Sequence, residues 1–118
     1  MTKASRIADK MAHIAAQIAD FRLGEKAVAR VGGGPDLVTH STLIAWHAGR
    51  LALLEWADKA SDAEIEARIA ELEASVTAEE LACKYGNMQS FGEAAYRSIC
   101  SIEILELALG THPAVAGR

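Results

Sequence analysis

Apolar residues near the start of the chain recur at alternating steps of four and three. They are Ile7, Met11, Ile14, Ile18 and Phe21. This spacing gathers them on one side of an α-helix, as in a helix packed against a core. We predict a helix over about residues 4–31. It should end at the glycine run 32–34, because glycine is costly to hold in a helix and readily takes positive φ.

A second helix is predicted over residues 35–59, because Pro35 has its φ preset for a first helical turn. This helix carries apolar residues on two opposite sides. At 100° per residue, one side holds Leu37, Leu43, Ile44, Leu51 and Leu54, and the other holds Val38, Ala45, Trp46, Leu53 and Trp56. Gly49 lies on the tryptophan side, where the missing Cβ would let another backbone approach. Such a helix belongs at the centre of a bundle or in an interface between subunits.

Capping patterns predict three further helices. Ser61 to Glu64 and Thr77 to Glu80 each have a hydroxyl residue followed three positions later by glutamate, the pattern in which both side chains bond otherwise unpaired amides. They predict helices over 62–75 and 78–85. A third such pattern, Ser90 to Glu93, opens a final helix over 91–109, with Gly110 past its end and residues 111–118 as a loose tail.

We therefore expect an all-α fold: a helical bundle of four to five helices in one domain, residues 1–118. The second and final helices carry more apolar surface than a chain of this size can hide, and such surface marks interfaces. The expected assembly is a two-fold homodimer. The candidate interface residues are Trp46, Leu53, Trp56, Ile104 and Leu107.

Composition narrows the classes of function. The chain has 118 residues, 51% of them hydrophobic, enough for one packed core. Its net charge of −4 provides no broad cationic field for nucleic acid. Charged residues recur too often for a membrane span, and no secretory signal pattern is present at the start. Two cysteines, Cys83 and Cys100, are too few for a disulfide framework. We expect a cytoplasmic protein with no membrane partner.

Two histidines are the most notable polar pair. His40 and His47 are seven residues apart, so they project from nearly the same side of the second helix. Their separation along the axis, roughly 10 Å, is too large for one shared ion. We interpret them as hydrogen-bonded residues at a packed surface, with a pH-sensitive contact as the sharper hypothesis. A bundle that binds a small apolar ligand or a metal near them is an alternative.

The segment from Thr77 to Gly86 resembles the first helix and turn of helix-turn-helix DNA-binding domains. It has a Glu-Glu-Leu-Ala run followed four residues later by glycine. The resemblance implies a DNA-binding regulator that uses residues 77–99. Past the turn, Asn87 stands where an apolar residue usually follows.

No set of side chains typical of an enzyme can be assembled from the sequence. A nucleophile with a base, a set of metal ligands or a pair of carboxylates in an apolar pocket would be needed. We therefore expect no catalytic residues, no metal and no cofactor. The leading hypothesis is a non-enzymatic protein–protein interaction module, an adaptor, inhibitor or assembly subunit, whose partner is a second copy and possibly another protein.

Overall fold

The computed structural model describes residues 2–30, 35–85 and 92–116, apart from the side chains of residues 24–30, 35–43 and 93. The described chain contains five helices and no strands, so the predicted all-α class is confirmed. The helices are α1 (Lys3–Arg30), α2 (Pro35–Lys59), α3 (Asp62–Ala74), α4 (Ala78–Ala82) and α5 (Glu93–Leu109). The largest difference from the predicted bounds is at α4, which ends three residues early.

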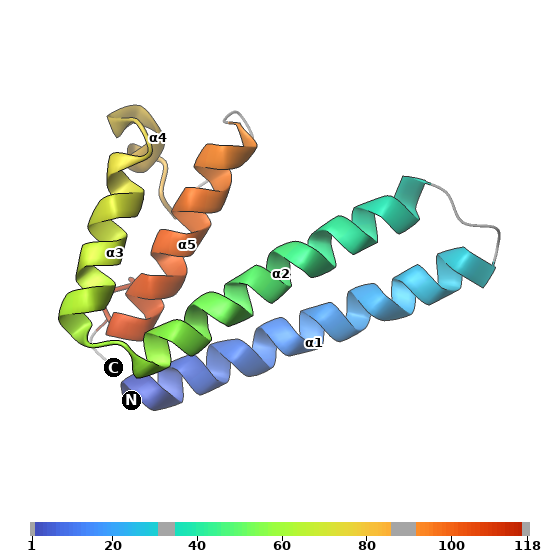
Figure 1. The fold of residues 1–118 in the computed structure, drawn as a ribbon, viewed down its shortest axis with the longest axis horizontal. Helices are drawn as coiled ribbons and strands as arrows, with labels where there is room; N and C mark the ends of the chain where they lie inside the picture. The colour runs from blue at the N-terminus through green and yellow to red at the C-terminus, as the bar shows by residue number, and fades with distance from the viewer. Residues whose placement is uncertain (1, 31–34, 86–91, 117–118) are drawn as a thin grey trace.

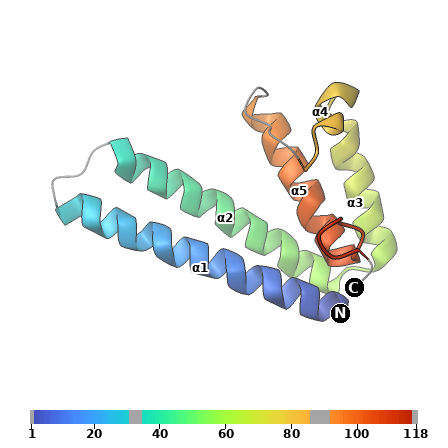
Figure 2. The same ribbon diagram turned by 180° about the vertical axis from the view of Figure 1, so that it is seen from behind.

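The helices form two arms that meet at a corner (Figure 1). The long antiparallel hairpin of α1 and α2 is one arm, and α3 with α5 is the other. Seen from behind, the arms diverge in the same way, and both ends of the chain lie at the corner (Figure 2). The radius of gyration is 15.8 Å, above the roughly 13.5 Å typical of a chain this long. The molecule is therefore elongated.

The hydrophobic core lies at the corner. The predicted stripe of α1 contributes Ile7, Ile14 and Ile18, each less than a tenth exposed. Leu54 of α2 and Ile65 of α3 have no exposed surface. The same cluster includes Ala57, Ala60, Ile104, Leu105 and Ala108. Four of the five helices therefore share one core.

The final helix is covered by its own chain more fully than we expected. Among the described residues, the main helix contacts join α1 to α2, α3 to α5, α2 to α5 and α1 to α5. Because α5 touches three helices, residues on several of its sides are buried: Ile99, Ile102, Ile104, Leu105 and Ala108. Ile104 is only 1% exposed. This corrects its assignment to an interface, since it has almost no surface left to offer a second copy.

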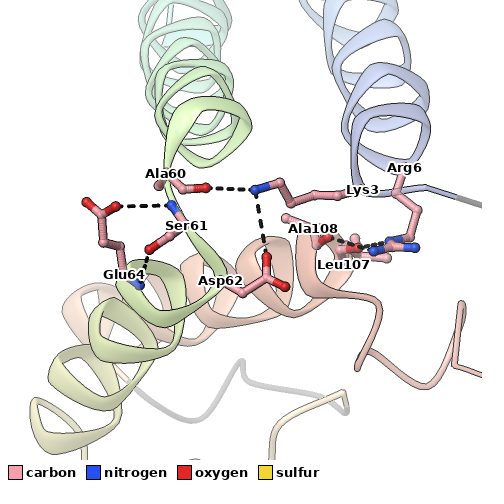
Figure 3. Close-up of polar contacts among 8 residues, drawn as sticks. All are labelled: Lys3, Arg6, Ala60, Ser61, Asp62, Glu64, Leu107 and Ala108. Carbon is pink, nitrogen blue, oxygen red and sulfur yellow. Dashed lines mark hydrogen bonds and ion pairs between the residues drawn. The ribbon is translucent and has the colours of Figure 1, made fainter.

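Local capping explains where α3 and α4 begin. Ser61 Oγ accepts a hydrogen bond from the Glu64 amide at 3.1 Å, and Glu64 Oε1 accepts one from the Ser61 amide at 3.1 Å (Figure 3). Thr77 and Glu80 repeat the arrangement at the start of α4. Both predicted capping boxes are confirmed. At α5 the N-cap is Gly92, with no side-chain cap; the predicted cap, Ser90, lies outside the described residues.

The first turn of α1 binds the carboxyl ends of two other helices (Figure 3). Lys3 Nζ donates to the Ala60 carbonyl at 2.7 Å. Arg6 donates through Nε to the Leu107 carbonyl and through Nη2 to the Ala108 carbonyl, both at 3.0 Å. Carbonyls in the last turn of a helix have no partner within the helix. Lys3 and Arg6 supply such partners, and the bonds from Arg6 to α5, with Lys3 Nζ 3.7 Å from Asp62 Oδ1 of α3, join the two arms at the corner.

Gly110 ends α5, as the sequence predicts. It has the left-handed conformation, with φ of 85°, that glycine adopts without strain. A Cβ at this position would also lie 3.0 Å from the Arg6 guanidinium carbon. Beyond it, the amides of Thr111 and His112 donate to the Glu106 carbonyl. The amides of Val115 and Ala116 donate in turn to the His112 carbonyl, so residues 111–116 form hydrogen-bonded turns after α5; residues 117–118 of the predicted tail lie outside the described residues.

Within the described part, no helix is long and apolar enough to cross a membrane.

Candidate functional site

One side of α2 is exposed and carries only small residues between positions 45 and 54, before the exposed Glu55. Every exposed residue between positions 45 and 54 is alanine or glycine: Ala45, Ala48, Gly49 and Ala52. Trp56 continues the row and is 39% exposed. We call Ala45, Gly49, Ala52 and Trp56 the outer strip of α2. Their spacing of four, three and four residues places them in one line, and a Cβ built at Gly49 meets nothing within 4 Å.

The other predicted interface residues differ in how far their own chain covers them. Trp46 is half-buried, with its ring 5.8 Å from that of Tyr96. Leu53 is partly buried against the core. Leu107 is half-buried on α5. Of the five, Trp56 is therefore the one whose large side chain is exposed, at 39%; Leu23 of α1, Tyr85 after α4 and Tyr96 of α5 are exposed large side chains elsewhere.

His47 is buried on the inner side of α2, 4% exposed. Its ring stacks on Phe21 of α1 at 5.5 Å between centroids. Its Nδ1 lies 2.8 Å from Nη1 of Arg50. A guanidinium can only donate, so Nδ1 accepts and the ring is neutral. Burial lowers the pKa of His47, and the charges of Arg50 and Lys10 lower it further. The side chain of His40 lies outside the described residues, so the histidine pair stays a prediction.

Arg50 separates two hollows between the arms. The first, which we call the Lys10 hollow, has a volume of about 280 Å³. It is lined by Lys10, Arg50, Cys100, Glu103, Ile104, Leu107, His112 and Ala114. The second, the Trp46 hollow, has a volume of about 260 Å³ and is lined by Ala45, Trp46, Gly49, Arg50, Arg97 and Ser101. Residues from both arms meet in each hollow.

The Lys10 hollow contains two cationic side chains, Lys10 and Arg50, whose charged forms are disfavoured by burial. Burial lowers the pKa of Lys10, as does the charge of Arg50, against an opposite effect of Glu103. Burial also lowers the pKa of Arg50, and its Nε is buried with no hydrogen-bond partner among the described residues. Both residues are half-buried. Two cations in a partly desolvated hollow favour an anionic group between them.

The sequence carried a signal for these two cations that we missed. Lys10 stands three residues after Ile7 and four before Ile14, so it falls on the apolar stripe of α1. Arg50 stands four residues before Leu54 in the same way. A charged residue on the buried side of a helix needs a partner or a role. Such a residue is a stronger pointer to a polar site than a pair of histidines.

A polar cluster ties the turn after α4 to α5. Tyr85 has φ of 73° and donates from its hydroxyl to Glu106 Oε2 at 2.7 Å. Its amide donates to Glu103 Oε1 at 3.0 Å. Lys84 Nζ lies 3.2 Å from Glu106 Oε1, and His112 packs edge-on against the Tyr85 ring. This cluster holds the short α4 segment and the chain end against α5.

The same region gives the helix-turn-helix resemblance no further support. In that family the second helix of the pair lies exposed in a DNA groove. Here α5 is the helix with the most neighbours, and the main contacts among the described residues do not include α4 with α5. The exposed positions near the start of α5 include Tyr96 and Arg97. Residues 86–91, which contain the turn glycine, lie outside the described residues.

The remaining reactive side chains form no chemical site in the described part of the chain. Cys83 and Cys100 are free thiols. Burial raises the pKa of Cys100, and Glu103 raises it further, which disfavours the thiolate. No group of three or more His, Cys, Asp or Glu residues able to hold a metal ion is found among the described residues.

No protein-family model, curated protein or solved structure matches the chain in the three comparisons with known proteins.

Proposed function

We propose that this chain is a non-enzymatic helical interaction module, an adaptor, inhibitor or assembly subunit, that forms a two-fold homodimer through the outer strip of α2. The observation that carries the proposal is an exposed row of alanine and glycine on α2 that ends at Trp56, with Arg50 and Arg97 beside its Ala45 and Gly49 half. Solvent-facing sides of helices are ordinarily polar. Here Ala45, Gly49 and Ala52 face solvent in line with Trp56.

The amount of exposed surface agrees with one interface per chain. The chain exposes 7030 Å² at a mass of 12.5 kDa. Monomeric proteins of that mass expose about 6,200 Å² by the usual scaling with mass. The surplus, roughly 800 Å², is what each partner buries in an interface of standard size.

The outer strip is also complementary to itself. Its first half is small, at Ala45 and Gly49, and its second half ends in the large ring of Trp56. If two copies of α2 cross antiparallel between Gly49 and Ala52, each Trp56 lies over the Ala45 end of the other copy. Gly49 then allows the two backbones to approach closely, as small residues do at helix crossings. A two-fold axis requires this kind of self-matching surface.

Native mass spectrometry tests the dimer. We expect the wild-type chain to be a dimer at micromolar concentration. Ala52→Glu places a carboxylate at the centre of the strip in both copies and should weaken dimerisation at least about tenfold, since like charges would be desolvated together. Ala67→Glu makes the same change at an exposed position of α3 and should leave the dimer intact.

Two results would contradict the proposal. One is a wild-type chain that is monomeric at micromolar concentration. The other is a folded Ala52→Glu variant that dimerises as strongly as Ala67→Glu. Circular dichroism of both variants separates loss of the dimer from loss of the fold.

A further inference from the structure

The Lys10 hollow contains two cations without a close counter-ion. Lys10 reaches it from α1 and Arg50 from α2. Among the described residues, neither has a carboxylate within the 4.0 Å that defines the ion pairs elsewhere in this structure. Burial penalises a charged group that has no partner, in proportion to the water it loses. Here the pairing is incomplete.

The charged groups around the hollow leave one positive charge in excess. Among the described lining residues Glu103 of α5 is the only carboxylate, and its Oε1 already accepts the Tyr85 amide. His112 also lines the hollow, and its Nδ1 accepts the Ala114 amide at 3.0 Å. Two cations against one carboxylate therefore favour a ligand with a single negative charge.

The guanidinium of Arg50 is held in place before any ligand arrives. Nη1 is fixed by the neutral His47 ring at 2.8 Å. The Trp46 ring lies 5.0 Å from the guanidinium carbon, a distance at which a cation is attracted to an aromatic face. Among the described residues, this bond to His47 is the only hydrogen bond that the guanidinium of Arg50 makes. A positioned arginine with free donors is suited to a planar carboxylate.

The rest of the lining is apolar and the hollow is small. Ile104, Leu107 and Ala114 supply hydrocarbon surface. The volume of about 280 Å³ is near the lower end of the roughly 300–1,000 Å³ of ligand pockets. We propose that the Lys10 hollow binds a small organic carboxylate, with Arg50 and Lys10 at its charged group and Ile104 and Leu107 along its hydrocarbon chain.

A titration with simple probes tests the site in the full-length chain. Butyrate and hexanoate are added while the backbone amide resonances of α1, α2 and α5 are followed by NMR. Inorganic phosphate and butyramide, an uncharged amide of similar shape, are added in parallel. We expect saturable shifts with both carboxylates, stronger with hexanoate because more hydrocarbon is buried, and none with butyramide.

Matched variants locate the binding. Arg50→Gln and Lys10→Met should each weaken hexanoate binding at least about tenfold, because each removes a charge that contacts the carboxylate. Arg68→Gln removes one positive charge from the exposed side of α3 and should leave the affinity unchanged. If Arg50→Gln fails to fold, Lys10→Met carries the test alone.

The proposal is overturned by any of four results. These are no saturable shift with either carboxylate, equal binding of butyramide, saturation by phosphate alone, or unchanged affinity in a folded Arg50→Gln or Lys10→Met variant. The outcome does not depend on the dimer, because the outer strip of α2 and the Lys10 hollow involve different residues.

Discussion

At the scale of single residues, His47 shows how a polar side chain is accommodated in an apolar position. It is enclosed by Phe21 and Trp46, and its unprotonated Nδ1 accepts from Arg50. Protonation would place an N–H against a guanidinium, and Lys10 adds a second repulsive charge. The folded state therefore disfavours the charged ring more than the unfolded state does.

This difference predicts how stability depends on pH. The pKa of His47 is lowered on folding, so below the unfolded pKa of about 6.5 the unfolded chain binds a proton that the folded chain does not. The contribution of His47 to stability should be constant above that pH and fall below it, by at most about 1.4 kcal/mol per pH unit, until the folded pKa is passed. Urea unfolding of the wild type and of His47→Gln at a series of pH values measures it.

The comparison isolates His47 from other groups. His47→Gln keeps an acceptor for Arg50 but cannot titrate, so its stability should vary less over the same pH range. His13→Gln changes an exposed histidine of α1 and should behave as the wild type does. A wild type and a His47→Gln variant with the same pH dependence would refute this role.

At the scale of secondary-structure elements, α3 and α4 begin with the same capping box, but only α3 buries a residue in the core. Ile65 of α3 is fully buried, whereas α4 buries no residue. Ser61→Ala should therefore lower the free energy of unfolding by about 1 kcal/mol. Thr77→Ala should lower it by much less, because fraying of α4 exposes little of the core.

Chemical denaturation of both variants checks this order. Ser61→Thr, which retains a hydroxyl acceptor, is the matched control and should lose little stability. Hydrogen exchange should show the Thr77→Ala effect confined to the amides of α4. A global loss in Thr77→Ala equal to that in Ser61→Ala would contradict the assigned roles.

The bounds of the helices could be predicted because their signals are local. Ser61, Thr77 and Gly110 each act within a few residues, through a cap or a backbone angle. The place of α5 could not be predicted in the same way. Its apolar residues could be covered by another copy or by its own chain, and only the arrangement of distant helices decides. For that reason Ile104 was assigned to an interface although it belongs to the core.

For the candidate site too, single residues could be predicted from local patterns, but their arrangement across helices could not. The sequence identified Trp56 as a candidate interface residue and His47 as a candidate polar site. In the structure Trp56 is exposed, and His47 is buried against Phe21. The sequence did not predict that Lys10 and Arg50 line the same hollow, because this depends on how α1 lies beside α2 and α5. A search of the sequence for charged residues on the apolar side of a predicted helix would have identified both Lys10 and Arg50.

At the scale of the whole molecule, the two arms depend on a small joint. Arg6 of α1 bonds the last carbonyls of α5, and Lys3 bonds the Ala60 carbonyl after α2. Arg6→Met should lower the free energy of unfolding by about 1–3 kcal/mol, because two part-buried carbonyls lose a charged donor. Urea unfolding gives the value.

Arg68→Met is the control for this change. Arg68 is exposed and, in the described part of the chain, pairs only with Glu71 of the same helix. Loss of such a surface pair should change stability by less than about 0.5 kcal/mol. Equal effects of Arg6→Met and Arg68→Met would mean that the joint does not hold the arms together.

Because α1 is anchored at the corner by its first turn, a small movement there is magnified at its other end. Its 28 residues span about 40 Å, and Lys10 lies only about 10 Å from the first turn that Lys3 and Arg6 anchor. Because α1 is packed along α2 and into the core at Ile14 and Ile18, it can pivot at that turn only together with α2. For such a rigid hairpin, a displacement of about 1 Å at Lys10 moves the far tip by about 4 Å. Small adjustments beside the pivot would be amplified at the distant end of the hairpin.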